Sequence, residues 1–359
     1  MTRHYIRSTV GAMTTRHGKA AILGGGIGGL TVANALVRRD WHVDVFERAP
    51  SLPETGTALG MWTEALDALT TAGCGSGLGG QVEKLGVLQD GAAFLRWDGR
   101  VIGRIRTMTR PVVLLSRPKL LTILAEGIPS DLVRFGAPAP ESPDLAAYDV
   151  VIAADGINSA TRDRLFGPAY RPVYTGYSAW RGWVPGTVST TSESWGPGAL
   201  FGITPRDGDL TNWFAAVRAP AGRTGSIDEL RERYRDWHPA VRDVLDRIDP
   251  ADVLHHDLYE SPPLPSFVRG NVALIGDAAH AMAPNLGRGA CEAMIDGATL
   301  AVLLSEHPVA EALERYDRAR RRRTQRLVRA SRFLARVATA RRFTALRDPF
   351  VGAAARFTR

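Results

Sequence analysis

Cysteine is scarce in this chain, and long hydrophobic runs are absent from it. The 359 residues include two cysteines, Cys74 and Cys291, which are too few for a disulfide framework and lack the spacing of a metal site. No stretch approaches the roughly 20 consecutive apolar residues that a transmembrane helix needs, and the first residues lack the apolar core of a signal peptide. We therefore expect a cytoplasmic protein that holds no zinc and has no membrane span.

Acidic residues are scarce at the two ends of the chain, and the net charge of +8 arises there. Residues 1–18 contain three arginines and no acid, and residues 309–359 contain 15 arginines against four acids. The C-terminal segment predicts a helix with a solvated arginine face. Nucleic-acid binding through it stays an alternative, although no aromatic residues interleave the arginines. The expected apolar stripe of this helix consists of Leu327, Ala330, Leu334 and Val337.

A glycine-rich turn lies between two predicted strands near the start of the chain. Apolar runs at residues 20–23 and 43–46 predict the strands, and residues 30–37 carry apolar side chains at helical intervals. An acid, Glu47, ends the second strand. This order predicts a site for an ADP-containing dinucleotide, and both NAD and FAD fit it. The glycines that follow the G-x-G-x-x-G spacing are Gly24, Gly26 and Gly29.

Each part of this motif has a physical role. Gly24 permits the tight turn, Gly26 lets a pyrophosphate approach the backbone, and Gly29 lets the helix pack on the strand. The N–H groups at the start of the helix face the phosphates. Glu47 is expected to accept hydrogen bonds from the ribose of the adenosine.

Later segments alternate between α/β and antiparallel β patterns. Residues 91–106 alternate around Asp98-Gly99, which predicts a β-hairpin. Residues 170–220 consist of short, aromatic-rich stretches typical of antiparallel sheet. An α/β domain with an antiparallel β domain inserted in pieces accounts for this order. The other expected elements are helices at 63–72 and 118–125, a loop at 72–80, and buried strands at 150–153 and 272–275.

Two acids follow the later buried strands. Asp155, with Gly156 after it, ends the strand at 150–153, and Asp277 ends the strand at 272–275. Ligands of open α/β sheets bind outside the carboxyl ends of the strands, and Asp277 is well placed for the ribityl chain of a flavin. Alternatively, each aspartate caps the helix that follows it.

Together, the three motifs resemble the class A, single-component FAD-dependent monooxygenases of the aromatic-hydroxylase (p-hydroxybenzoate hydroxylase-like) family. The resemblance extends from about Lys19 to the basic C-terminal helix. It implies bound FAD, NADH or NADPH as a transient reductant, and hydroxylation or epoxidation of a hydrophobic, aromatic small molecule by O₂ through a C4a-hydroperoxyflavin. A redox-neutral or reductase flavoprotein of the same fold, or a nucleic-acid-binding flavoprotein, stays an alternative. A flavin-dependent halogenase is excluded, because the tryptophans of "WRGWVP" are separated by two residues instead of one.

The resemblance also implies which residues hold the flavin. Arg48 stands beside the ribose acid, and Arg117 opens a helix and contacts the cofactor. Pro284 shapes a turn whose N–H groups near Leu286 and Gly287 stabilise negative charge at the flavin N1–C2=O. The complete cofactor set is Gly24, Gly26, Ile27, Gly29, Glu47, Arg48, Arg117, Asp155, Gly156, Asp277, Pro284, Leu286, Gly287 and Gly289.

The substrate is expected beside the strand predicted at residues 174–185. Arg181 is the candidate catalytic residue near the ring edge, unless it stacks on a neighbouring tryptophan. Trp180 and Trp213 are expected to line the cavity, although core packing would also explain Trp213. His280 is expected to be structural, because the implied mechanism needs no such base. Arg288 and Glu292 replace glutamines common in the family.

The chain is therefore expected to be an α/β protein, with a Rossmann-like FAD-binding domain around a parallel sheet, an inserted antiparallel β substrate domain and a C-terminal helix. A flexible extension is expected at 1–18 and a basic helical segment at 309–359. The FAD-binding domain comprises 19–81, 109–169 and 266–308, and the substrate domain 82–108 and 170–265.

Overall fold

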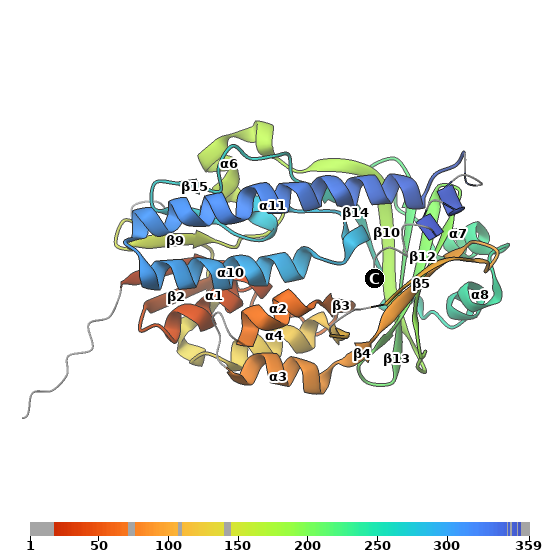
Figure 1. Cartoon of the computed structure of the whole chain (residues 1–359), viewed down its shortest axis with the longest axis horizontal. Coiled ribbons are helices and arrows are strands. Elements are labelled where there is room, and N and C mark those ends of the chain that lie inside the picture. The colour runs from red at the N-terminus through yellow and green to blue at the C-terminus, as the bar shows by residue number, and fades with distance from the viewer. Residues whose placement is uncertain are drawn as a thin grey trace, which may run out of the picture.

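Three β-sheets organise the chain, and a long C-terminal helix runs along two of them (Figure 1). This arrangement is seen in a computed structural model, which describes residues 18–70, 76–106, 110–139, 145–342, 344, 347–349 and 351–352. Apart from residue 18, the extension expected at 1–18 lies outside the described residues, and so does part of the segment after the long helix.

A six-stranded sheet carries the glycine-rich turn. Its strands pair in parallel except at one edge, where β15 and β16 are antiparallel. The expected parallel sheet is thus confirmed except for β15, which returns through the short turn at Gly270 and Asn271 and cannot run parallel to its neighbour. The strands, in sheet order, are β15 (Val268–Arg269), β16 (Val272–Leu274), β9 (Val150–Ala153), β1 (Lys19–Leu23), β2 (His42–Glu47) and β8 (Val133–Phe135).

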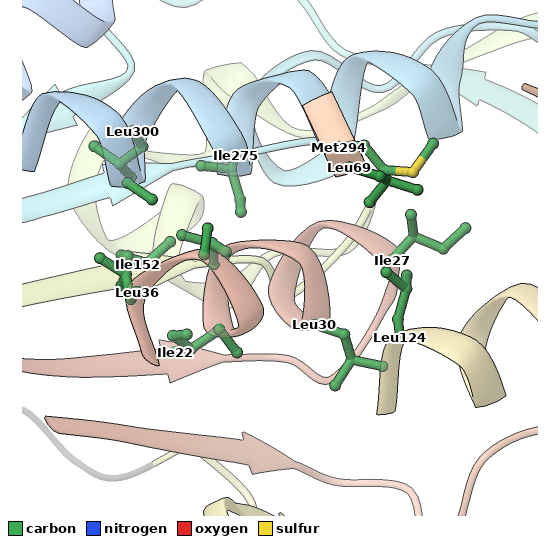
Figure 2. Close-up of a cluster of buried hydrophobic side chains, with 14 of the residues drawn as sticks. Ile22, Ile27, Leu30, Leu36, Leu69, Leu124, Ile152, Ile275, Met294 and Leu300 are labelled. Atoms are coloured by element: carbon green, nitrogen blue, oxygen red, sulfur yellow. The ribbon is translucent and has the colours of Figure 1, made fainter. Parts of the chain in front are cut away.

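Two helices pack on each other over one face of this sheet, as Figure 2 shows. Helix α1 (Ile27–Val37) lies between the sheet and helix α10 (Gly289–Glu306), so ten of its 11 residues are buried. The close approach of the two helices favours a glycine, because a Cβ on Gly297 would lie only 3.1 Å from the carbonyl oxygen of Gly28. The surrounding apolar cluster includes Ile22, Leu30, Leu36, Ile152, Met294 and Leu300.

A small antiparallel sheet, β3 (Ala58–Met61), β7 (Val112–Ser116) and β4 (Val87–Gln89), lies beside helices α2 (Thr63–Thr70), α3 (Ser76–Leu85) and α4 (Arg117–Glu126). The loop predicted at 72–80 is therefore wrong from Ser76 onward. Burial of Leu78 and Val82 in the main core stabilises α3 in spite of its three glycines, because tertiary packing overrides a weak local preference.

A seven-stranded sheet forms the other half of the molecule. Its pairs are antiparallel except for β11 and β5, which are parallel. The hairpin predicted at 91–106 is confirmed, and it joins this sheet although the other strands come from 173–260. The strands, in order, are β14 (Leu254–Glu260), β10 (Val173–Pro185), β13 (Leu210–Arg218), β12 (Ala199–Arg206), β11 (Thr191–Gly196), β5 (Gly91–Arg96) and β6 (Val101–Arg106). The expected domain boundaries stay a prediction.

Each face of the seven-stranded sheet has its own cover. Helices α7 (Ile227–Tyr234) and α8 (Pro239–Asp246) pack on one face. The C-terminal end of α11 (Val309–Ala338) packs on the other, where Leu334 and Val337 join the apolar cluster that includes Trp195 and Leu200. The short elements are α6 (Ala160–Phe166), α9 (Asp277–His280) and the 3₁₀ helices η1 (Ser130–Leu132), η2 (Pro168–Tyr170), η3 (Pro250–Asp252) and η4 (Pro284–Leu286).

Helix α11 differs from its predicted pattern. Ala330, expected in the apolar stripe, is exposed, and the buried face instead passes through Val328, Ser331 and Ala335. Arg320 is also on this face and is only 3% exposed, although the arginines were expected to face water. No helix in the described ranges is long and apolar enough to cross a membrane.

Candidate active site

The glycine-rich turn joins the end of β1 to the start of α1. Gly24 has a φ of +111°, and a Cβ there would lie 2.4 Å from the carbonyl oxygen of Ala154. A Cβ on Gly29 would lie 1.9 Å from the carbonyl oxygen of Gly24. A Cβ on Gly26, in contrast, would meet no heavy atom within 4 Å. The packing of the protein itself therefore requires Gly24 and Gly29. Gly26 faces open space, so a ligand can approach its backbone closely.

Neighbouring residues complete this end of the site. The Glu47 carboxylate accepts hydrogen bonds from the N–H groups of Gly25 (2.7 Å) and Ala49 (2.8 Å), so it lies directly over the turn. Each carboxylate oxygen keeps a further lone pair for a ribose hydroxyl. Arg48 is exposed, and Ile27 is buried in the core, so only the backbone of Ile27 is available to a phosphate.

The Asp155-Gly156 loop follows β9, the neighbour of β1. Asp155 Oδ2 accepts a hydrogen bond from the Thr161 N–H at 3.1 Å, whereas Oδ1 is buried and has no hydrogen-bond partner among the described residues. Ser159 caps helix α6 by accepting from the Arg162 N–H at 2.9 Å. Since a buried polar atom normally has a partner, Asp155 Oδ1 is suited to accept a hydrogen bond from a ligand.

Arg162 connects the loops that carry the two strand-end aspartates, and it is a site residue that was not among those expected from the sequence. Its side chain is 1% exposed and donates to the carbonyl oxygens of Ile157 (2.7 Å) and Ala278 (3.2 Å). Burial lowers the pKa of its guanidinium, although Asp163, Asp155 and Asp277 act in the opposite direction. One buried cation therefore holds the loop after β9 against the loop after β16.

Asp277 remains accessible at the start of α9. The surrounding protein removes water from its carboxyl and so raises the carboxyl pKa, while the charges of His280, Arg117 and Arg162 act to lower that pKa. Arg117 begins α4 and is exposed; within the described ranges, no carboxylate forms an ion pair with it. The charges of Arg117 and Arg162 thus act on the same carboxylate from two different helices.

The loop before α10 adds backbone groups to this site. η4 begins at Pro284, and Gly287 has the left-handed φ of +61°. The N–H of Gly287 donates to the carbonyl of Pro284 at 2.8 Å, so it is already used inside the turn. This bond competes with the predicted stabilisation of flavin charge by the Gly287 N–H, and the same role for the Leu286 N–H stays a prediction. Helix α10 begins at Gly289 and directs the positive end of its dipole toward the loop.

A chain of buried charges lies behind the loop. His280 Nε2 lies 2.5 Å from Asp296 Oδ2, and Arg320 Nε donates to Asp296 Oδ1 at 2.6 Å. Arg320 also pairs with Glu292, which accepts from Arg288 at 2.9 Å. Burial acts to lower the pKa of His280, but Asp296 outweighs it and raises that pKa. Asp296 therefore holds the His280 ring in place and favours its protonated form; the expected structural role of His280 stays a prediction.

Acid is expected to weaken this network at Asp296. Burial acts to raise its pKa, but His280 and Arg320 lower the pKa from 3.8 to about 2. The ionised carboxylate therefore stabilises the fold above about pH 4, and this contribution is lost as the pH falls toward 2. We expect the free energy of unfolding to lose about 2 kcal/mol through this residue. Urea unfolding between about pH 5 and pH 2 tests this; equal slopes for the wild type and Asp296→Asn would contradict it.

The seven-stranded sheet presents Arg181 toward the flavin-site residues. Burial lowers the pKa of Arg181, and the nearby Arg117 lowers it further, so the two guanidinium groups are neighbours. Arg181 does not share a face with Trp180, and the ring of Trp183 is occupied by Arg206, at 4.6 Å from its centroid. The Nε of Arg181 is buried and has no hydrogen-bond partner in the described part of the chain. It is therefore suited to donate to a ligand.

Trp180 and Trp213 lie on the opposite face of this sheet. Trp180 stacks on His255 with ring centroids 4.1 Å apart, and Trp213, which is fully buried, stacks on Phe201 at 5.9 Å. Both belong to the apolar cluster under α7 and α8. The structure thus places them in the core, which is the alternative stated above for Trp213.

Two contacts join the sheets around Arg181. Asp207, at the β12–β13 turn, accepts hydrogen bonds from the N–H (2.7 Å) and hydroxyl (3.0 Å) of Ser116, the residue before Arg117. Asn212 of β13 accepts from the Ala58 N–H of β3 at 2.9 Å. These bonds fix the start of α4, and with it Arg117, against the sheet that carries Arg181.

Known proteins resemble both halves of the chain. Residues 22–53 match the family described as NAD(P)-binding Rossmann-like domain, and residues 198–331 match the one described as FAD binding domain. Aurachin C monooxygenase/isomerase of Stigmatella aurantiaca is 33% identical over 337 residues, covering 86% of this chain and 87% of the relative. 3-Amino-4-hydroxybenzoate 2-monooxygenase of Streptomyces cremeus is 32% identical and covers 90% and 88%. The structure of Klebsiella pneumoniae HpxO complexed with FAD and uric acid matches with a TM-score of 0.82 at 25% identity, covering 94% and 92%.

Proposed function

We propose, because the chain belongs to the class A FAD-dependent monooxygenases of the aromatic-hydroxylase family, that it hydroxylates a planar aromatic small molecule with NAD(P)H and O₂. The observation that carries this proposal is the convergence of three motifs at the carboxyl ends of β1, β9 and β16. Arg162 joins the motif after β9 directly to the motif after β16. Arg181, on the seven-stranded sheet, lies near Arg117 of the flavin site. Such an edge is where α/β sheets bind dinucleotides.

The residues present fit an FAD molecule. The open space at Gly26 admits the pyrophosphate, and Glu47 is positioned for the adenosine ribose. Asp155 Oδ1 has no hydrogen-bond partner in the described ranges, and Asp277 is an accessible acceptor; both are suited to hydroxyls of the elongated cofactor. When bound there, FAD supplies the electron transfer from NAD(P)H to O₂ that side chains cannot perform.

This chain's own residues orient the reactants and control charge. Arg117 and Arg181 provide two cations at the border between the sheets, where they favour a substrate or cofactor group that carries negative charge. Helix α10 adds the positive end of its dipole. The Ser116–Asp207 and Ala58–Asn212 hydrogen bonds hold the two sheets together around this border, so the cations keep their positions during the reaction.

Oxygen dependence tests the proposal. We expect purified protein to retain FAD and to oxidise NADH or NADPH over many turnovers in air, with matching O₂ uptake, and to stop after about one equivalent per flavin under argon. A first panel of substrates includes urate and 3-amino-4-hydroxybenzoate, which the names of two relatives specify. Asp277→Ala, expected to lose FAD, is the control. Continued NAD(P)H oxidation without O₂ uptake would instead favour the reductase alternative.

A further inference from the structure

A half-buried carboxyl group, Glu193, lies on the same face of the seven-stranded sheet as Arg181, and the mechanism above gives it no role. The register places Arg181 opposite Phe214, Phe214 opposite Gly202, and Gly202 opposite Glu193. Residues directly opposite each other on paired strands share a face. These four positions therefore form one row across β10, β13, β12 and β11.

This row lies between two rows that are covered. On one side, Leu200 and Ala216 pack against the C-terminal part of α11. On the other side, Asn212 bonds to the small sheet through Ala58. In the row itself, Arg181, Phe214 and Glu193 all keep part of their surface exposed, although Phe214 also packs against the apolar cluster beside α11. The row is therefore partly exposed, and its Arg181 end borders the flavin-site residues, because Arg181 and Arg117 are neighbours.

Gly202 gives the row a flat floor. A Cβ on Gly202 would lie 2.0 Å from Cζ of Phe214, so the Phe214 ring extends over the glycine and covers the gap that a side chain would fill. An aromatic substrate ring can stack on such a surface. Three strand spacings separate Arg181 from Glu193, which amounts to about 14 Å between their backbones. The floor is thus flanked by a cation at one end and a carboxyl group at the other.

Glu193 has no cationic partner within the described residues, because none of the salt bridges there includes it. Its Oε1 accepts a hydrogen bond from Trp195 Nε1 at 2.5 Å. Burial raises the pKa of the carboxyl to about 7, although the bond from Trp195 acts to lower it. A carboxyl group in this state exchanges a proton readily near neutral pH, which sets it apart from the ion-paired acids of the buried network.

We propose that Glu193 accepts a hydrogen bond, and then the proton, from a hydroxyl group of the substrate, while Arg181 binds an anionic or acceptor group at the opposite edge. The inference rests on the proposed monooxygenase function. It defines the substrate as a planar aromatic molecule with a hydroxyl donor at one edge and a carboxylate or carbonyl oxygen at the other. It also makes Glu193 a specificity-determining residue of the site.

The proton transfer has a direct chemical consequence. The O–H bond of the substrate breaks, the proton binds to a carboxylate oxygen of Glu193, and the electron pair stays on the substrate oxygen. Delocalisation of that pair raises the electron density at the ortho and para carbons of the ring, where an electrophilic oxygen adds. The proton returns to the product oxygen or passes to water, so Glu193 is regenerated with its original charge.

Matched ligands test this inference by equilibrium binding. The probes are 4-hydroxybenzoate with 4-methoxybenzoate, and 6-hydroxy-2-naphthoate with 6-methoxy-2-naphthoate, and binding is followed by the absorbance change of the bound flavin. We expect the wild type to prefer the hydroxyl compound of at least one pair by about tenfold or more, because the methoxy compound cannot donate to the carboxylate. Glu193→Gln is expected to reduce this preference to within about threefold, and Glu193→Asp is expected to keep most of it.

Two controls separate the possible failures. Arg181→Gln is expected to weaken both members of a pair equally, since it acts on the carboxylate that they share. Glu229→Gln, an exposed acid on α7, should change nothing. A preference that survives in Glu193→Gln, or a wild type that binds none of the four probes, would overturn the inference. Loss of O₂ uptake in a wild type that still discriminates between the probes would instead overturn the monooxygenase function.

Discussion

Gly26→Ala is expected to leave the fold intact and to lower FAD affinity by at least about 100-fold, whereas Gly29→Ala is expected to prevent folding. A Cβ on Gly26 meets no protein atom within 4 Å, so it costs the protein little. It would, however, occupy the space through which the pyrophosphate approaches the backbone. On Gly29 the same atom would lie 1.9 Å from the carbonyl oxygen of Gly24, which is backbone and cannot rotate away.

Flavin content and folding can be measured on the same samples. Absorbance of FAD per protein after gel filtration reports retention, and FAD titration of the stripped protein reports affinity. Circular dichroism and thermal unfolding without FAD report the fold. Gly28→Ala is a useful further control, because a Cβ there would meet Ala293 of α10 and the side chain of Ile275 at 3.4 to 3.5 Å, which is ordinary contact. Wild-type FAD affinity in Gly26→Ala would contradict the assignment of the phosphate site.

Arg320→Met is expected to lower the free energy of unfolding by about 3–5 kcal/mol. The guanidinium is buried and pairs with Asp296 and Glu292, both fully buried. Without it, two carboxylates remain in the core with only His280 and Arg288 to compensate them. Removal of one member of a buried charge network is costly because the remaining charges keep their desolvation penalty.

The neighbouring arginine Arg318 provides the matched control. It is on the same helix, but its side chain is 68% exposed and its contact with Glu314 is 3.7 Å long. Exposed pairs of this kind contribute about 0–1 kcal/mol, so Arg318→Met should unfold at nearly the same urea concentration as the wild type. The double variant Glu292→Gln/Arg320→Met should recover part of the lost unfolding free energy, since it removes one of the two carboxylates left without Arg320. Equal stability of the Arg318 and Arg320 variants would sink this interpretation.

The flavin-binding edge could be predicted from the sequence because its signals are local. Gly24, Gly26 and Gly29 fall within a few residues of a strand and a helix, and the buried runs before Asp155 and Asp277 are continuous. Their common edge then follows from the rule for parallel strands. The hairpin around Asp98-Gly99 was also predictable, because its turn residues set the pairing of the flanking strands.

Features that depend on distant partners could not be predicted. Arg320 is one of 15 arginines in the C-terminal segment, and only the contacts with Asp296 and Glu292, 24 and 28 residues earlier, distinguish it. Trp180 and Arg181 are adjacent, and alternation along β10 shows that they face opposite ways without showing which face the helices cover. Glu193 was missed because its relation to Arg181 arises from the register of three strand pairs.

The long C-terminal helix also bears on the order of events during protein synthesis. Residues 309–338 leave the ribosome after every strand of the three sheets, yet they supply the cation that neutralises Asp296 and Glu292 behind the loop that begins at Pro284. In a nascent chain that ends before Arg320, the carboxylates of Asp296 and Glu292 behind this loop lack their main cationic partner. We therefore expect a late, nearly complete translation product to be the first species that captures its coenzyme.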